Sequence, residues 1–221
     1  LSNPANPCGV CLKEEDVVHL KNYCEKVGIY LIFDEVYDHF IYEGRCCSGT
    51  SYVLESDFII RTGSFSKDYA MSGWRVGYLV ASPSHVLNFT AIQDGTLCCP
   101  NVIGQYAALF ALQHKELIDD QVKIVENNLE LICHFLKPLV ETEIFSYIKP
   151  QAGIFLFIKT PFTDSENMVM DILKKEKVAL VPGKDFGGCP DPLSHIRLCF
   201  ARKESVIREG AERLLRYYGI K

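Results

Sequence analysis

The pattern of apolar and polar residues along the chain predicts alternating helices and strands. From Lys13 to Val27, apolar residues recur at helical spacing, acidic residues occupy the first turn, and Gly28 follows as a stop signal, which predicts a helix. An apolar run from Ile29 to Phe33 then predicts a buried strand that ends at Asp34. By the same criteria we predict two further strands, at Phe58 to Thr62 and at Arg75 to Ala81.

The second half of the chain combines long helical patterns with short strands. Helices are predicted at about Ser84 to Gly95 and Asn101 to His114, and a long amphipathic helix runs from Asp119 to Lys137 and ends at Pro138. The elements predicted beyond it are a strand at Gly153 to Lys159, a helix at Ser165 to Lys175, strands at Val178 to Val181 and His195 to Phe200, and a helix at Lys203 to Tyr217. This change of pattern predicts two domains, residues 1–119 and residues 120–221, the second a smaller α+β domain.

Two of the predicted strands lead directly into residues that can do chemistry. Ligands of open parallel sheets bind beyond the carboxyl ends of the strands. Asp34 ends the first such strand, and the stretch SFSKDYAMSGWRVGY, Ser64 to Tyr78, follows the second. An amine such as that of Lys67 can form a Schiff base with a carbonyl, and the guanidinium of Arg75 suits a phosphate. The stretch therefore predicts an anchor for an aldehyde cofactor that carries a phosphate.

Five motifs resemble, in their order and spacing, the fold-type I aminotransferases, the class I/II family that depends on pyridoxal 5'-phosphate (PLP). They are the NPxG turn of Asn6 to Gly9, the DExY of Asp34 to Tyr37, the SxSK of Ser64 to Lys67, the GWRxGY of Gly73 to Tyr78, and HIRLCFA at His195 to Ala201. The resemblance covers nearly the whole chain. It implies an α/β fold in which residues 1–119 are the C-terminal portion of the PLP-binding large domain, with a mainly parallel sheet, and residues 120–221 are the small domain.

The resemblance also implies a role for each matched side chain. Lys67 is expected to hold PLP as a Schiff base and to move a proton as a general base, so it is the expected catalytic residue. A carboxylate beside the ring nitrogen favours its protonated form. The residues implied to bind the cofactor are Asp34 at the ring nitrogen, Asn6 and Tyr37 at the phenolate oxygen, and Ser64, Ser66 and Arg75 at the phosphate. Arg197 is implied to bind the substrate α-carboxylate with its bidentate guanidinium.

The activity implied is the transfer of an amino group from an amino acid to a 2-oxo acid, by a protein that is typically a homodimer. Members of the family carry a phosphate-binding loop, a ring-stacking aromatic residue and a dimer arm ahead of the NPxG turn, whereas this chain opens at Leu1, already at the turn. We therefore interpret it as the C-terminal part of a longer protein that lacks the N-terminal half. We expect the chain alone to be inactive, since its site would be incomplete.

Two other interpretations stay open at this point. A lyase or a synthase similar to 1-aminocyclopropane-1-carboxylate synthase would use the same lysine and aspartate, because the bond held perpendicular to the ring determines the reaction. A truncated, non-catalytic homologue or structural fragment, which binds nothing or acts through a partner, is the second interpretation.

Composition excludes some classes of function. The net charge of -5 comes with mixed signs and no basic stripe, so nucleic-acid binding is not expected. No apolar run is long enough to predict a membrane span, and without a signal-peptide pattern we expect a cytoplasmic location. The six histidines lack ligand spacing, so no metal site is predicted. Most of the ten cysteines fall inside predicted elements as small apolar residues, and Cys8 and Cys11 form a CxxC that is a weak redox or zinc signal.

Overall fold

A computed structural model describes residues 1–187 and 191–220, and these residues form two compact units. The first unit comprises Leu1–Asn6, Val10–Val122 and Gln151–Gly153. The second comprises Pro7–Gly9, Lys123–Pro150 and the residues from Ile154 onward. The division between the units falls between Val122 and Lys123, while the domain boundary near Asp119 stays a prediction.

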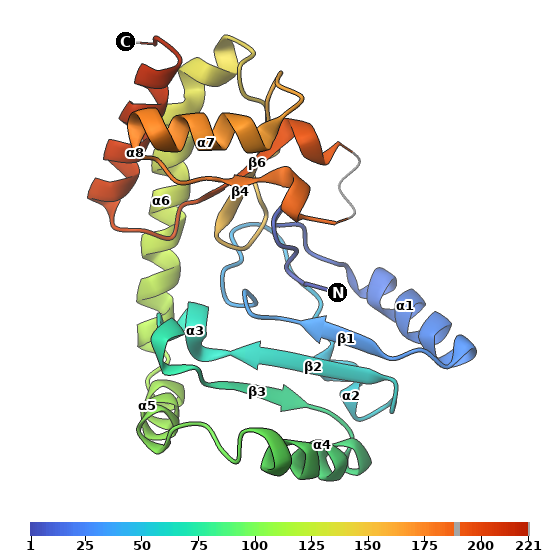
Figure 1. Cartoon of the computed structure of the whole chain (residues 1–221). Coiled ribbons are helices and arrows are strands. Elements are labelled where there is room, and N and C mark those ends of the chain that lie inside the picture. Colours follow the sequence, from blue (N-terminus) through green and yellow to red (C-terminus); the bar gives the residue numbers. More distant parts are fainter. Residues whose placement is uncertain (188–190, 221) are drawn as a thin grey trace. The chain divides into compact units, whose positions relative to one another are not determined.

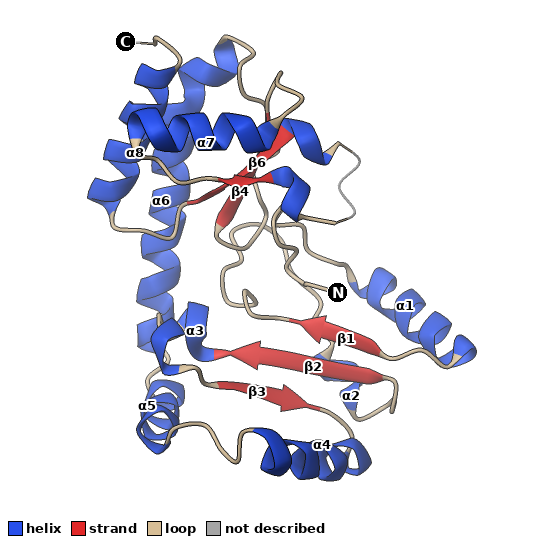
Figure 2. Cartoon of the chain, in the orientation of Figure 1, coloured by secondary structure: helices blue, strands red, loops and turns tan. Residues whose placement is uncertain are grey.

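The first unit is built on a three-stranded sheet in the order β1-β2-β3, formed by Leu31–Asp34, Ile59–Ser64 and Gly77–Val80. Strands β1 and β2 are parallel, with Asp34 opposite Thr62. Strand β3 runs antiparallel to β2, with Gly77 opposite Ser64, and Figure 2 shows its arrow pointing the other way. The carboxyl ends of β1 and β2 and the first residue of β3 therefore meet at one edge of the sheet.

Helices lie around this sheet, and the sequence predicts the three longest of them (Figure 1). They are α1 (Glu14–Val27), α2 (Thr50–Val53), α3 (Phe65–Asp68), a 3₁₀ turn η1 (Ser72–Trp74), α4 (Pro83–Thr96) and α5 (Val102–Gln113). The prediction for α1 is confirmed to within one residue, because Lys13 is its N-cap and Gly28 ends it in the left-handed conformation at a φ of 71°. The predictions for α4 and α5 are also confirmed, and Asn101 caps α5 by accepting a hydrogen bond from Gly104 N.

Two apolar clusters hold the first unit together. One packs α1 against the sheet through Val17, Phe33, Val53 and Ile59. The other packs α3 and the segment before β3 against α5 through Phe65, Met71, Val76, Ala108 and Ala111. The second cluster fixes the short helix that carries Lys67, since Phe65 lies in the same turn. Helix α5 also leaves apolar side chains exposed, namely Val102, Ile103, Tyr106, Leu109, Phe110 and Leu112.

The second unit contains an antiparallel sheet in the order β4-β6-β5, with β6 (His195–Cys199) between β4 (Phe155–Lys159) and β5 (Val181–Pro182). Its helices are the later part of α6 (Glu116–Glu141), α7 (Ser165–Glu176) and α8 (Glu204–Tyr217), with 3₁₀ turns η2 (Gly183–Asp185) and η3 (Pro192–Ser194). Fully buried side chains from these helices and strands form its core, among them Leu129, Ile132, Leu156, Ile172 and Ile196. The mixture of short strands and helices confirms the predicted α+β pattern.

The structure corrects three predicted boundaries. Helix α6 continues through Pro138 to Glu141, because the proline removes only one backbone donor while Leu139 beside it is fully buried. Strand β3 begins at Gly77 and not at Arg75, because Arg75 has a left-handed φ of 57° that no strand residue adopts. Strand β5 is limited to Val181–Pro182, which pair with Arg197 and Ile196.

Among the described residues, no helix is both long enough and apolar enough to cross a membrane.

Candidate active site

The predicted catalytic lysine lies at the edge of the first sheet where β1 and β2 end. Ser64 is the last residue of β2 and the N-cap of α3, and its Oγ accepts a hydrogen bond from Ser66 N at 3.1 Å. Lys67 lies in the single turn of α3 that follows and is partly buried. The strand and its cap therefore hold Ser64, Ser66 and Lys67 within one turn of backbone.

Arg75 approaches the same edge from β3. The antiparallel register places Gly77 opposite Ser64, and Phe65 N donates to Val76 O at 3.3 Å, so the segment before β3 lies against α3. The guanidinium of Arg75 is exposed, and its Nη1 donates to Ser72 O at 3.1 Å. A guanidinium, two hydroxyls and an amine are thus gathered at one edge, a set of donors whose chemistry fits a phosphate and an aldehyde.

Asp34 ends β1 at this edge beside the first residues of the chain. Its backbone N donates to Leu1 O at 2.8 Å and its O accepts from Asn3 N at 3.0 Å, while its side chain is exposed. Asn6 lies exposed in the NPxG turn, which Ala5 N closes by donating to Val10 O at 2.9 Å. Tyr37 is buried in the turn after β1. The topology thus brings the cofactor-binding residues predicted in the first unit to the end of the sheet or to the segments beside it.

Arg197 belongs to the second unit, on the central strand β6. Its backbone lies between Phe157 of β4 and Val181 of β5. Its guanidinium lies 4.0 Å from the ring centre of Phe155 and 4.8 Å from that of Phe186, which is cation–π geometry. The aromatic rings orient the guanidinium within its own unit, and its predicted role toward Lys67 remains a proposal.

The structure adds a buried ionic network in which two motif residues, Glu35 of DExY and Tyr78 of GWRxGY, bind a residue outside the motifs. Arg61 on β2 donates from Nε to Glu35 Oε2 at 2.6 Å, from Nη1 to Tyr78 Oη at 2.8 Å, and from Nη2 to Asp38 Oδ2. Burial alone would lower the pKa of Arg61, but its hydrogen bonds to Glu35 and Tyr78 raise it. Sequence reasoning missed this network. The signal that could have indicated it is the cation Arg61 within the mostly apolar strand β2, since a buried cation needs a partner of opposite charge.

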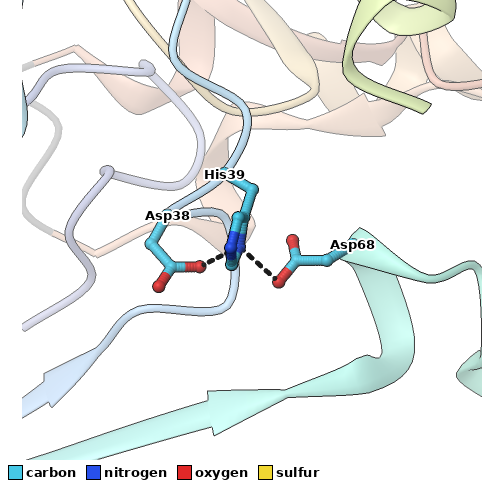
Figure 3. Close-up of side chains that lie close together, drawn as sticks. All are labelled: Asp38, His39 and Asp68. Carbon is cyan, nitrogen blue, oxygen red and sulfur yellow. Dashed lines mark hydrogen bonds and ion pairs between the residues drawn. The ribbon is translucent and has the colours of Figure 1, made fainter. Parts of the chain in front are cut away.

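His39 extends this network to α3, as Figure 3 shows. Its Nδ1 lies 3.0 Å from Asp38 Oδ1 and 3.1 Å from Asp68 Oδ2. Hydrogen bonds that the ring donates to Asp38 first, and then to Asp68, raise the pKa of His39 to about 10. Burial raises the pKa of Asp68. Sequence spacing could not reveal this cluster, because 29 positions separate His39 from Asp68.

A cavity of about 230 Å³ adjoins the cluster within the first unit. It is lined by side chains of opposite charge and by aromatic rings, including His39, Ser64, Asp68, Tyr78, Lys115 and Asp119. Cofactor cavities usually begin at about 300 Å³. The cavity is therefore smaller than a usual cofactor site.

Comparisons with known proteins give a consistent result over nearly the whole chain. Residues 1–214 match the family model described as aminotransferase class I and II. The aspartate aminotransferase of Thermotoga maritima is 32% identical, with 97% of this chain and 54% of the relative covered. The aromatic aminotransferase ISS1 of Arabidopsis thaliana is 29% identical, with 97% and 55% covered.

Solved structures agree with these relatives. A crystal structure of the Thermotoga maritima aspartate aminotransferase matches with a TM-score of 0.85 and 31% identity, covering 98% of this chain and 55% of that chain. The aromatic aminotransferase of Pyrococcus horikoshii matches with a TM-score of 0.86 and 27% identity, covering 98% and 59%. These neighbours confirm the predicted fold class. The chain spans about half the length of the curated relatives it matches, and it belongs to the class I and II aminotransferase family.

Proposed function

We propose that this chain supplies the lysine anchor and much of the cofactor-binding surface of a PLP-dependent aminotransferase. The observation that carries the proposal is the meeting of Asp34, Ser64, Lys67 and Arg75 at one edge of the β1-β2-β3 sheet. When bound there, PLP supplies an electron sink for the carbanion that forms at the substrate α-carbon. The cavity of about 230 Å³ then serves as one part of a larger cofactor site.

The proposed binding roles are those that the family resemblance implies, and the charge of the side chains supports them. Arg75 and the hydroxyls of Ser64 and Ser66 bind the phosphate, because a planar cation and neutral donors suit its oxygens. Asp34 binds the protonated ring nitrogen, because a carboxylate at the strand end favours that charge. Asn6 and Tyr37 donate hydrogen bonds to the phenolate oxygen.

Lys67 is proposed to act both as the covalent anchor and as the base that carries a proton from the substrate α-carbon. A lysine can serve in both roles once substrate has displaced its amine. Arg197 is proposed to bind the substrate α-carboxylate, and its restraint between Phe155 and Phe186 supports a fixed bidentate geometry. The substrates are then an amino acid and a 2-oxo acid, and the full-length protein is proposed to be a homodimer.

The test is to incubate the chain with PLP, reduce it with borohydride, and locate the phosphopyridoxyl group by peptide mass spectrometry. We expect Lys67 to carry more of the label than any other lysine, and Lys67→Ala to lose that label. Lys115→Ala is the matched control, since Lys115 lines the adjoining cavity without a proposed role, and it should leave the labelling of Lys67 intact. Label spread evenly over the lysines would overturn the proposal.

A further inference from the structure

His39 links the two segments that carry the proposed cofactor-binding groups, although the proposed function gives it no role. It lies in the segment after β1, five positions beyond Asp34. Its Nδ1 contacts Asp68 Oδ2 at 3.1 Å, and Asp68 is the last residue of α3, directly after Lys67 (Figure 3). The imidazole therefore joins the short helix that carries Lys67 to the segment that follows Asp34.

The buried carboxylate of Asp68 has its counter-charge in His39. Asp68 is only 4% exposed, and its Oδ1 has no hydrogen-bond partner among the described residues. A buried carboxylate without a counter-charge is costly, and His39 is the cation in contact with it. Nδ1 lies between Asp38 and Asp68, and in either charge state it can donate its one proton to only one of them at a time. A positively charged ring also attracts the other carboxylate, so it suits the pair better than a neutral ring.

The segment after β1, which carries His39, is held in place by ion pairs with a buried arginine. Asp38 also binds Arg61 through Oδ2, and Arg61 is paired with Glu35, which is 1% exposed. Across the cavity, the remaining charged groups that face His39 are Lys115 and Asp119. The ion pairs with Arg61 leave Asp38 few alternative positions, so they help to define where His39 holds Asp68.

We propose that His39 is a positioning residue for Lys67, acting through Asp68 to fix the orientation of α3 relative to the end of β1. This inference rests on the proposed function. The competing interpretation is a divalent cation held by Asp38, His39 and Asp68, whose ligand atoms lie within 4.8 Å of one another. A metal requires the neutral imidazole, whereas the two carboxylates favour the protonated one, and Asp38 is already bound to Arg61.

The first experiment measures the share of the PLP label that Lys67 carries in the whole chain and in three variants. His39→Ala removes the donor, and His39→Asn keeps an amide near the position of Nδ1. His85→Asn is the matched control, because the His85 ring bonds the backbone O of Asp57 at 2.8 Å and no carboxylate among the described residues. We expect His39→Ala to lower the share on Lys67 about tenfold, since small displacements of a reactive group have effects of this size. His39→Asn should recover part of it, and His85→Asn should leave it unchanged.

The second experiment follows the imidazole signals of the chain by ¹⁵N NMR without PLP. We expect the His39 ring to remain protonated above about pH 8 in the wild type and to lose its proton at lower pH in Asp68→Asn. A change of the His39 signal on addition of Zn²⁺ at neutral pH, reversed by EDTA, would overturn the inference in favour of a cation site.

The outcomes distinguish a failure of the positioning role of His39 from a failure of the proposed function. Absence of preferred labelling of Lys67 in the wild type overturns the proposed function, whatever the NMR titration gives. Preferred labelling that His39→Ala leaves unchanged overturns the positioning role alone. A fall in labelling that only matches the unfolded fraction, measured by circular dichroism, overturns it as well.

Discussion

Arg61 Nε lies 2.6 Å from Glu35 Oε2, and both side chains are buried in the first unit. Glu35 also accepts hydrogen bonds from Gly49 N at 2.5 Å and Ser48 Oγ at 2.6 Å, so both of its oxygens have donors. This pair connects β2, which ends at Ser64, to the segment after β1, which carries Tyr37, and both of these residues are proposed to bind the cofactor. Removal of one partner would leave a buried charge without its counter-charge.

Arg61→Met should therefore destabilise the chain by about 3–5 kcal/mol, the usual cost of breaking a buried ion pair. The measurement is the free energy of unfolding from urea titration followed by circular dichroism. Arg208→Met is the matched control, because Arg208 pairs with Glu204 one helical turn away at the surface, and it should cost about 0.5 kcal/mol or less. Similar losses of unfolding free energy in both variants would show that the buried pair stabilises the chain no more than the surface pair does.

Gly63→Ala should displace the ring of Tyr78. A Cβ at position 63 would lie 2.3 Å from Tyr78 Cζ, which forces the ring away from its hydrogen bond with Arg61. We expect a loss of about 1–3 kcal/mol in unfolding free energy, the range for overpacking. A Cβ at Gly73 would meet no atom within 4 Å, so Gly73→Ala serves as the control and should cost clearly less.

The raised pKa of His39 predicts stability that declines as the pH rises. The pKa is about 10 in the folded chain against 6.5 as the ordinary value, so the folded state retains the proton between these two values. The contribution is complete below about pH 6.5 and is lost as the pH rises toward 10. The difference in melting temperature between the wild type and His39→Asn should therefore shrink over this range. A difference that grows with pH would contradict the assignment.

Cys11 should be more reactive at neutral pH than Cys133, which is also partly buried. A hydrogen bond from the Cys46 thiol lowers the pKa of Cys11, whereas burial raises the pKa of Cys133. Alkylation with iodoacetamide, quantified by peptide mass spectrometry, should modify Cys11 faster than Cys133. Cys46→Ala should slow the reaction of Cys11, while Cys98→Ala should leave it unchanged. An alkylation rate of Cys11 that is the same in Cys46→Ala as in the wild type would rule out the hydrogen bond from Cys46 as the cause.

The parts of the fold that the sequence predicts well are those set by neighbouring residues. The acidic first turn and Gly28 define α1, and the motif residues Ser64 and Lys67 follow β2 directly. The backbone conformation of Arg75 could not be predicted from neighbouring residues. Its left-handed φ of 57° depends on the packing of the segment between η1 and β3, and an arginine does not by itself indicate such a conformation.

The features of the fold and the site that the sequence does not predict depend on contacts between distant segments. The ion pair of Arg61 with Glu35 and the contact of His39 with Asp68 exist only because β1 and β2 are parallel neighbours. Similarly, Cys11 is next to Cys46, a pairing that the CxxC spacing does not indicate. Extension of α6 past Pro138 depends on burial of Leu139, which local helix rules do not include.

The exposed apolar side chains of α5 determine how this chain behaves in solution. Ile103 and Tyr106 are each 71% exposed, and the net charge of -5 gives only weak repulsion between molecules. Physiological salt screens such charges beyond about 8 Å, while apolar attraction persists at short range. The isolated chain will accordingly be retained on hydrophobic-interaction resins, precipitate at low concentrations of ammonium sulfate, and keep best in dilute, low-salt buffer.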